Sequence, residues 1–439
     1  MQPDAEQKAQ LVQIRKRAET NLAENVMPFW ATHTWDEQYG GFLTRLDREG
    51  RRLDDSEKFL MMQIRMISSL SAAHRHGLRD RGYLELACKG YDFLVNHMWD
   101  KTNGGFFHSV ARDGTPNTTR KNTDVHAYAL TGLTEHYRAS ERREVLDRAL
   151  QVFDLLMAEA ADRDLGFIED FDGGEWPVLN DEQMNLGDRT DIKTVDMHTN
   201  VMEGFLYLAR TTGDAAHLNA LREVTELIRT KGIDPQHGCS ITAFDRDWNP
   251  ISDGSGNMTT CYGLNIEMAW LMLEAIDLLG ESWPDWRPTI LGLIDHALAF
   301  GFDHKRGGFA AYGPMHGSVV DADELAPDRM LKPWWVQAEG LNALLDAWLW
   351  SEAQRYLDAF LKLFDWVWIR QIDHECGGWY QDTDWETGTP ATTDKGREYK
   401  TSFHTSRALI RVASALGLLL SHGSGWSPCL CSGQRPKDI

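Results

Sequence analysis

The chain has 439 residues, of which 42% are hydrophobic, 25% charged and 10% aromatic, and its formal net charge is −21. This length suits two or three ordinary domains, or one large toroid or barrel. Such an acidic chain without a long Lys/Arg run argues against a nucleic acid or an anionic membrane as partner, because either needs a basic surface. A few buried cations that bind a sugar phosphate are not excluded.

The beginning of the chain and its cysteines indicate a cytoplasmic protein. The first twenty residues are polar with a helical pattern, so we expect no signal peptide. The apolar stretch 409–420 contains Arg411 and is too short to span a bilayer. The six cysteines include no CxxC pair, which predicts neither a zinc site nor a disulfide framework. The 17 Trp residues suit either a cleft that binds sugars or the core of a large helical protein.

An Asp followed four residues later by Gly recurs six times, usually with a second Gly and an aromatic residue. Neighbouring copies are 62 to 72 residues apart. Because six copies share one internal offset, the chain is predicted to consist of six structural repeats. The six pairs are Asp36/Gly40, Asp100/Gly104, Asp162/Gly166, Asp234/Gly238, Asp303/Gly307 and Asp373/Gly377.

Each copy is predicted to lie between two helices. An amphipathic stretch such as 81–98 or 351–369 precedes it, with apolar residues at helical spacing. The Asp and glycines form a turn, and a short alternating run after them reads as a small β-hairpin. A second helix follows in each repeat, at roughly 57–78, 121–138, 194–211, 260–279, 331–350 and 400–421.

The second helices are apolar nearly all round, which is typical of buried helices. Six inner and six outer helices in alternation predict an all-α (α/α)6 barrel with short β-hairpins in the connecting loops. A linear solenoid of helical hairpins is the competing architecture. The polar residues of the inner helices favour a closed ring, because one open end of the ring would give these side chains contact with solvent. No linker divides the chain, so we expect one domain over 1–422 and a loosely packed tail over 423–439.

Polar residues of the inner helices gather near their N-terminal ends, and in a closed barrel they would meet at one mouth. Buried charges must pair with each other or contact a polar ligand. Structural ion pairs that brace the ring remain an alternative for Glu267, Glu339 and Arg407. His198 and His404 each lie one turn into a buried helix, where an imidazole can be tuned across neutral pH. No HExxH or two-His-carboxylate spacing is present, so we expect no metal.

The sequence resembles the N-acylglucosamine 2-epimerase superfamily, which includes cellobiose 2-epimerases, mannose isomerases and sulfoquinovose isomerase. The resemblance runs from about residue 20 to 420 and implies an (α/α)6 barrel. It is carried by MHTNVMEGFLYL (197–208), YGLNIEMAWL (262–271), KPWWVQAEGLNAL (332–344) and SFHTSRALI (402–410), with support from KFLMMQIR (58–65).

The resemblance implies a cofactor-free proton transfer next to a sugar carbonyl. A histidine removes the C2 proton of the opened sugar to give a cis-enediol, and reprotonation at C2 or at C1 gives an epimer or a ketose. A base near neutral pKa and a fixed cation suit this chemistry. By match, His404 is the C2 base, His198 assists at the ring or carbonyl oxygen, Arg65 stabilises the enediolate, Trp335 stacks on the sugar, and Glu267 and Glu339 orient histidines or hold hydroxyls. The predicted substrate-binding set is completed by Asn265, Tyr262, His126, Tyr399 and Arg407.

The chain departs from the family pattern at two positions. Leu264 stands where family members have a second catalytic histidine, and it cannot carry a proton. Epimerisation needs groups on both faces of the enediol, whereas aldose–ketose isomerisation can use a single base, so an isomerase is favoured. His126 or Tyr262 could also take over the lost role. Tyr399 replaces an expected Trp, which favours a monosaccharide such as mannose, glucose or fructose over a disaccharide.

Two other classes of function remain open. The same toroid hosts glycoside hydrolases and lyases, because a fold does not fix chemistry, and these would need paired carboxyl groups. A sugar-binding protein that has lost catalysis is the second alternative. In each case the expected partner is a small sugar, with no cofactor, and the chain is expected to be a monomer or homodimer.

Overall fold

The structure is a computed structural model that describes residues 3–54, 57–162, 166–179, 184–185, 188–189, 192–251, 259–316 and 330–422. The predicted tail, 423–439, lies outside the described residues. The inner helices are α3 (Leu60–Arg75), α5 (Thr123–Ser140), α7 (Val195–Thr212), α9 (Tyr262–Leu279), α11 (Trp334–Ser351) and α13 (Phe403–His422). The outer helices are α1 (Ala5–Thr20) with α2 (Met27–His33), α4 (Tyr83–Phe93), α6 (Arg143–Leu155), α8 (Ala215–Leu227), α10 (Trp283–Phe300) and α12 (Gln354–Trp366).

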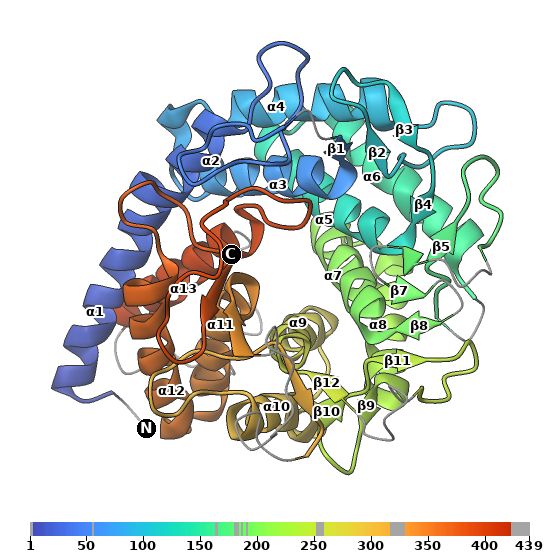
Figure 1. Ribbon diagram of the computed structural model, residues 1–439. Coiled ribbons are helices and arrows are strands. Elements are labelled where there is room, and N and C mark those ends of the chain that lie inside the picture. Colours follow the sequence, from blue (N-terminus) through green and yellow to red (C-terminus); the bar gives the residue numbers. More distant parts are fainter. Residues whose placement is uncertain are drawn as a thin grey trace.

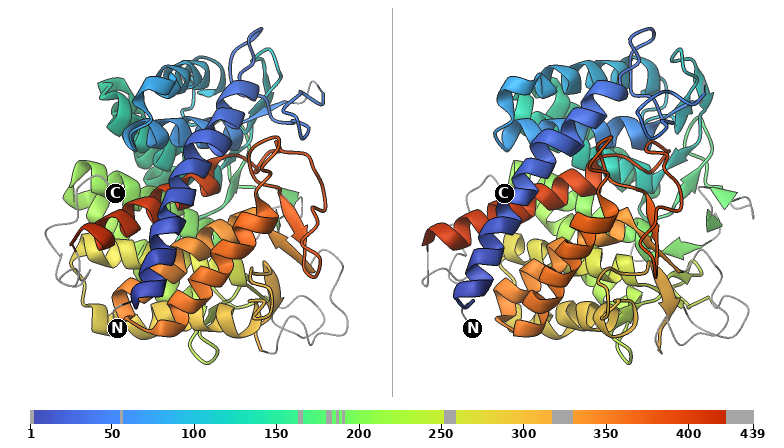
Figure 2. Two further views of the ribbon diagram at one scale, coloured as in Figure 1. Left: turned by 90° about the vertical axis from the view of Figure 1, so that its left-hand side faces the viewer. Right: turned by 60° about the vertical axis from the view of Figure 1, so that its left-hand side comes forward.

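The inner helices form a closed ring. Each packs against the next one along the chain, and α13 returns to pack against α3 (Figure 1). The outer helices surround this ring, and α1 crosses the outside of α13 (Figure 2). The predicted (α/α)6 barrel is therefore confirmed, and the linear solenoid is excluded because the last inner helix contacts the first.

Most outer helices end in a π-helical turn that leads into the Asp–Gly turn. These π-helical segments are η1 (Asn21–Val26), which joins α1 to α2, η3 (Leu94–Met98), η4 (Leu156–Ala160), η6 (Ile228–Gly232) and η8 (Val367–Gln371). A short 3-10 segment, η2 (Arg79–Arg81), separates α3 from α4.

The Asp–Gly turns at Asp36, Asp100, Asp234, Asp303 and Asp373 share one geometry, in which the glycine N–H donates to the Asp carbonyl. In the first, the Asp36 carboxylate accepts the backbone N–H of Gln38 at 3.1 Å, and Gly40 has a φ of +71°. The same glycine of every copy lies in this left-handed region, which explains why the position is glycine. The buried Lys58 ammonium donates to the Asp36 carboxylate at 3.0 Å. Equivalent pairs with a buried lysine join Lys121 to Asp100, Lys193 to Asp162, Lys332 to Asp303 and Lys395 to Asp373.

The predicted local hairpins are present as short antiparallel pairs, such as Leu46 with Arg52 and Thr383 with Pro390, and strands of different loops also pair with each other. Most strands that precede an inner helix pair with a strand from the next connecting loop, because successive loops meet at one end of the ring. These antiparallel pairs are β1 (Lys58–Phe59) with β2 (Ser109–Val110), β4 (Lys121–Asn122) with β5 (Asp170–Phe171), β8 (Lys193–Thr194) with β11 (Ala243–Phe244), β12 (Thr259–Cys261) with β13 (Tyr312–Pro314), and β14 (Leu331–Pro333) with β15 (Asp382–Asp384). Local pairs also occur, namely β2 with β3 (Pro116–Thr118), β6 (Met184–Asn185) with β7 (Asp188–Arg189), and β9 (Ile233–Asp234) with β10 (Cys239–Ser240).

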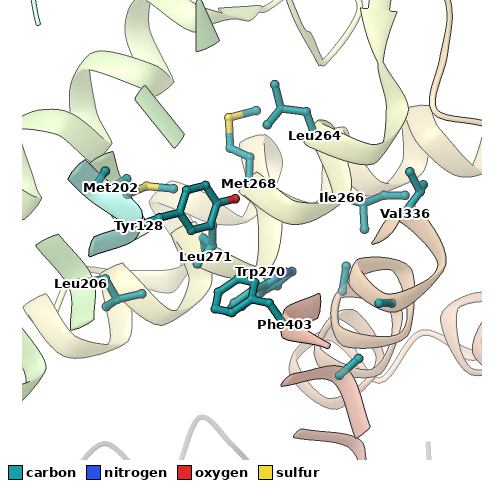
Figure 3. Packing of buried hydrophobic residues seen from close by; sticks show 14 of the residues in the cluster. Tyr128, Met202, Leu206, Leu264, Ile266, Met268, Trp270, Leu271, Val336 and Phe403 are labelled. Atoms are coloured by element: carbon teal, nitrogen blue, oxygen red, sulfur yellow. The ribbon is translucent and has the colours of Figure 1, made fainter. Parts of the chain in front are cut away.

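The hydrophobic core includes side chains of both the outer and the inner helices. Figure 3 shows Leu264 and Met268 of α9 beside Met202 of α7 and Tyr128 of α5. Burying this apolar surface is the main stabilising contribution. No helix in the described part of the chain is both long and apolar enough to cross a membrane.

Candidate active site

Six side chains occupy corresponding positions on the six inner helices. Each lies seven residues after a residue that shortly precedes its inner helix. These preceding residues are Lys58, Lys121, Lys193, Thr260, Lys332 and Lys400. The six residues are Arg65, Tyr128, Asn200, Glu267, Glu339 and Arg407. All lie in the N-terminal half of their helices, at the end of the ring that carries the short strands (Figure 2).

The Arg407 guanidinium is the centre of a buried charge network. It donates to Glu203 at 2.7 Å, to Glu267 at 2.8 Å and to Glu339 at 2.7 Å. These carboxyl groups come from α7, α9 and α11, so one arginine of α13 ties together four of the six inner helices. The predicted bracing ion pairs are present.

His404 is held by the same network. Its Nδ1 lies 2.7 Å from a carboxylate oxygen of Glu339, and its side chain is 4% exposed. A carboxylate accepts only, so Nδ1 carries the proton and donates. Nε2 enters none of the hydrogen bonds found within the described residues. The imidazole is thus fixed in the tautomer whose free lone pair is on Nε2.

Glu339 is the most heavily bonded acid of the network. Besides His404 and Arg407, it accepts from the indole N–H of Trp270 at 2.9 Å and from the Asn342 amide at 3.1 Å. Burial alone would raise its pKa, but Arg407 and His404 outweigh burial and lower the pKa to about 2. Glu339 therefore remains ionised at neutral pH.

The other two acids behave in the opposite way. Burial raises the pKa of Glu267 well above its usual range, and the charge of Glu339 adds to this rise. Burial also raises the pKa of Glu203, whose second oxygen is buried without a partner. One arginine cannot balance three carboxylates in a dry core, which disfavours the charged forms of Glu203 and Glu267.

Burial lowers the pKa of His404 to about 3, and the charges of Arg65 and Arg407 act in the same direction. The hydrogen bond that His404 donates to Glu339 opposes this shift without reversing it. The imidazole is therefore neutral and able to accept a proton over the whole physiological pH range, although as a base it is weaker than the predicted group near neutral pKa.

Arg65 lies close to His404. Its guanidinium lies 4.2 Å from the ring centre of Tyr128 and 5.4 Å from that of Phe403, the residue before His404. It donates to the backbone carbonyl of Tyr399 at 2.7 Å, while its Nε is buried without a partner. A cation is thus fixed beside the histidine and keeps donor capacity for a ligand.

A hollow of about 870 Å³ adjoins this region. Tyr399 and Trp334 contribute to its wall, and the Trp334 ring makes an edge contact with His404 at 6.3 Å between centroids. The Tyr399 hydroxyl is buried without a partner. Trp335, half-buried, lies 6.1 Å from the His404 ring and packs where a Cβ on Gly263 would collide with it.

The imidazole rings of His198 and His126 are held by hydrogen bonds to backbone groups. In both rings Nε2 accepts a backbone N–H of the preceding turn, from Phe167 at 3.1 Å and from Phe106 at 2.8 Å, and Nδ1 bonds a backbone carbonyl. Both side chains are fully buried. Neither ring takes part in the hydrogen bonds of the His404 network within the described residues, and both nitrogens of each ring bond to backbone groups.

The repeat explains these two histidines. Gln63, Asn265 and Gln337 occupy the same position in other repeats, and each accepts the equivalent backbone N–H through its amide oxygen. A comparison of the repeats with one another would have found this, since glutamine or asparagine replaces histidine there. Asn265 therefore braces its turn.

Tyr262 also lies outside the network. Its hydroxyl donates to the Pro314 carbonyl at 3.0 Å, and its ring packs where Gly301 and Gly313 leave room. Leu264, the fourth residue after Thr260, corresponds to His404, the fourth after Lys400. It is buried beside Met268 (Figure 3).

Three polar side chains that form hydrogen bonds near the site were not predicted from the sequence. Trp270 and Asn342 donate to Glu339, and the Asn200 amide donates to Asp124 at 2.6 Å. Trp270 and Asn342 lie in sequence stretches that carry the family resemblance, and Asn200 is one of the six corresponding residues of the inner helices. An alignment of the repeats with one another could therefore have identified them.

Glu267, Glu339 and His404 place one ligand atom each within 4.8 Å of one another. This donor set could in principle hold a cation. Arg407, however, already bonds to both carboxylates and occupies the cationic position. A divalent ion there would face a fixed guanidinium, so these residues do not fit a metal centre.

Comparison with known proteins places the chain among sugar-converting enzymes. The family model described as N-acylglucosamine 2-epimerase (GlcNAc 2-epimerase) matches residues 40–408. The cellobiose 2-epimerase of Dictyoglomus turgidum is 25% identical over 395 residues, which cover 89% of this chain and 96% of that protein. The human N-acylglucosamine 2-epimerase is 24% identical over 440 residues, covering 95% and 94% of the two chains.

Solved structures agree with this result. The cellobiose 2-epimerase from Spirochaeta thermophila superposes with a TM-score of 0.84 at 29% identity, covering 95% of this chain and 100% of that one. A D-mannose isomerase superposes with a TM-score of 0.77 at 19% identity over 94% and 100% of the chains, which shows the shared fold.

Proposed function

Because the chain belongs to the N-acylglucosamine 2-epimerase family of sugar epimerases and isomerases, we propose that it interconverts a free reducing monosaccharide without a cofactor, through a cis-enediol and with His404 as the base. The observation that carries this proposal is the pairing of His404 Nδ1 with Glu339, which leaves Nε2 as the free nitrogen.

The proposed cycle begins with the open-chain sugar beside His404, approached from the hollow lined by Tyr399 and Trp334. Nε2 takes the C2 proton, and the carbonyl oxygen becomes negatively charged. Arg65 is the fixed cation at which this charge develops, and such preorganised stabilisation is commonly the largest catalytic contribution. The neutral histidine becomes an imidazolium next to ionised Glu339, which stabilises the new charge.

The proton then returns from His404 to C1 or to C2. Delivery to C1 from the same face, together with transfer of the O2 hydroxyl proton to the negative O1, gives the ketose and needs a single base at carbon. Epimerisation needs a proton donor on the opposite face, where the residue that corresponds to His404 on α9 is the aliphatic Leu264. With His126 and Tyr262 bonded to backbone groups, we favour aldose–ketose isomerisation of a mannose-, glucose- or fructose-like sugar.

Glycosidic-bond hydrolysis fits the site less well. It requires two carboxyl groups on either side of the scissile bond. Here Glu203, Glu267 and Glu339 converge on a single guanidinium and are buried. A merely sugar-binding role would not require the His404–Glu339 pair.

The test is incubation with aldoses and ketoses in D2O, followed by NMR. We expect deuterium at C2 of the aldose, or at C1 of the ketose, together with interconversion of the two. Release of reducing ends from oligosaccharides without exchange would support a hydrolase instead. Sugar binding without either signal would support the non-catalytic alternative.

A further inference from the structure

Aldose–ketose isomerisation moves two protons, of which His404 carries the one between C2 and C1. The second proton must leave the O2 hydroxyl and reach O1, because the aldose carbonyl becomes a hydroxyl while the C2 hydroxyl becomes the ketone. This step needs a group that both donates and accepts a proton at these oxygens. Arg65 does not provide it, because a guanidinium keeps its protons and only donates hydrogen bonds.

Glu267 is a carboxyl group of the inner ring that lies next to the proposed base. Its Oε1 lies 3.9 Å from Nδ1 of His404, and both residues are 4% exposed. Its helix, α9, is the third inner helix from α3 in either direction round the closed ring. Glu267 and Arg65 occupy corresponding positions on these two helices, so they lie on opposite sides of the ring.

One oxygen of Glu267 takes part in the charge network and the other does not. Oε1 accepts from the Arg407 guanidinium at 2.8 Å, whereas Oε2 has no hydrogen-bond partner among the described residues. Both oxygens of Glu339 already accept hydrogen bonds. Glu203 also bonds Arg407, but within the described residues it forms no ion pair with His404. Glu267 is therefore the acid of the network that has an unused oxygen beside the base.

The N-terminal half of α9 offers few other groups for the role. Leu264 lies three residues before Glu267, hence on the same side of the helix, and its aliphatic side chain cannot carry a proton. Tyr262 is titratable, but its hydroxyl donates to the Pro314 carbonyl. Within this half of the helix, Glu267 is thus the titratable group that lies beside His404.

The surroundings of Glu267 favour its neutral form. Burial raises the pKa of its carboxyl well above the usual range, and the charge of Glu339 raises this pKa further, while Arg407 acts against the rise. A neutral carboxyl group donates through its O–H and accepts through its other oxygen. These are the two capacities that proton transfer between neighbouring hydroxyl oxygens requires.

We propose that Glu267 is a second catalytic residue, which carries the hydroxyl proton from O2 to O1 of the enediol. This inference rests on the proposed isomerase function. Nε2 of His404 takes the C2 proton, the electron pair of that C–H bond forms the C1–C2 double bond, and the carbonyl π pair moves to O1. Glu267 gives its proton to O1, which leaves a neutral cis-enediol and a carboxylate.

The second half of the cycle restores both groups. The Glu267 carboxylate takes the O2 proton, and the electron pair of that O–H bond forms the C2 carbonyl. The electron pair of the C1–C2 double bond takes the proton of the His404 imidazolium at C1. The product is the ketose, and the histidine is again neutral and the glutamate again protonated.

The experiment follows two rates in D2O by NMR, namely deuterium entry at C2 of the recovered aldose and formation of the ketose. Glu267→Gln should lower ketose formation about 10²-fold or more, because an amide does not transfer a proton. The same variant should lower C2 exchange less than about tenfold, because the amide still donates a hydrogen bond to O1. Glu267→Asp keeps a carboxyl group and should recover part of the ketose formation.

Glu274→Gln is the matched control. Glu274 is a buried glutamate seven residues further along α9 and accepts from Arg411 at 2.6 Å. Its replacement should leave the ratio of the two rates at the parental value. An infrared difference spectrum between the parent and Glu267→Gln at neutral pH gives an independent check and should contain the carbonyl band of a protonated carboxyl group.

The proposal is overturned if Glu267→Gln lowers both rates in equal proportion, as a merely structural role would, or if the infrared band is missing. A parent chain that exchanges no deuterium with any aldose would instead refute the proposed function itself. The two failures are distinguishable, because the first is a ratio of rates in an active protein and the second is an absence of exchange.

Discussion

At the scale of single residues, the three glutamates that share Arg407 differ in the direction in which their pKa values are shifted. Glu339 is ionised and holds His404, whereas burial raises the pKa of Glu203. Replacing each by its neutral isostere should therefore have unequal effects.

Glu339→Gln should lower kcat about 10²-fold or more, since the amide cannot stabilise the imidazolium that forms. Glu203→Gln is the matched control, because its amide oxygen can still accept from Arg407, and it should cost less than about tenfold. Steady-state kinetics of both variants provide the measurement. Equal losses would contradict the assignment.

The pH profile should reflect the lowered pKa of His404. Because this pKa is about 3 instead of the ordinary 6.5, the base remains unprotonated as the pH falls. We expect kcat/KM to stay flat from about pH 8 to about pH 5. An acid limb centred on the ordinary histidine value, in protein shown to be folded by circular dichroism, would refute the shift.

Leu264 should determine the product. The parent is expected to form the ketose faster than the C2 epimer, as measured by NMR of initial products. Leu264→His places a titratable group at the position that corresponds to His404 and should raise the epimer fraction, whereas Leu264→Met should leave the ratio unchanged. An epimer formed first by the parent would contradict the one-base pathway.

At the scale of the elements, the repeat made the fold predictable. The recurrence of Asp and Gly located the turns, and the all-round apolar helices after them located the inner ring. The partners of the short strands were not predictable, because Lys58–Phe59 pairs with Ser109–Val110 of the next loop only once the ring has placed them side by side.

The site was predictable in part for the same reason. Charges on apolar helices had to meet, and Arg407, Glu267 and Glu339 do so. The role of His198 could not be decided from the sequence, because a histidine that braces a turn and one that moves a proton have the same local sequence environment. Only the hydrogen bonds of its two ring nitrogens separate the roles.

The buried lysine that five of the six turns share should be a major stabilising element. Lys121 donates to Asp100 at 2.8 Å, and both are buried. Lys121→Met leaves a buried carboxylate unpaired and should cost roughly 3–5 kcal/mol in urea unfolding. The double variant with Asp100→Asn should recover part of this loss. Lys89→Met, at an exposed pair with Glu85, should cost less than about 1 kcal/mol. Similar losses for the two single variants would contradict this role of the turn.

At the scale of the whole molecule, several buried neutral histidines make stability depend on pH. Burial lowers the pKa of His126, His136 and His198 to about 4 each. Between that value and the ordinary 6.5, the unfolded chain binds more protons than the folded one, so stability rises with pH across this window and falls on acidification.

We therefore expect the urea midpoint to drop clearly between pH 7 and pH 5. His126→Gln should make this drop smaller, since Gln63 and Gln337 show that glutamine serves the same position. An unchanged pH dependence in that variant would show that His126 does not contribute to it.

The central claim is that His404, and not His198, moves the proton. The most direct measurement compares deuterium incorporation from solvent at the carbon next to the sugar carbonyl in His404→Gln and His198→Gln, with thermal unfolding as the check on folding. The account predicts a loss of about 10²–10⁴-fold in the exchange rate for the first variant and near-parental exchange for the second. Persistent exchange without the imidazole at 404, or its disappearance with glutamine at 198 in a folded protein, would contradict it.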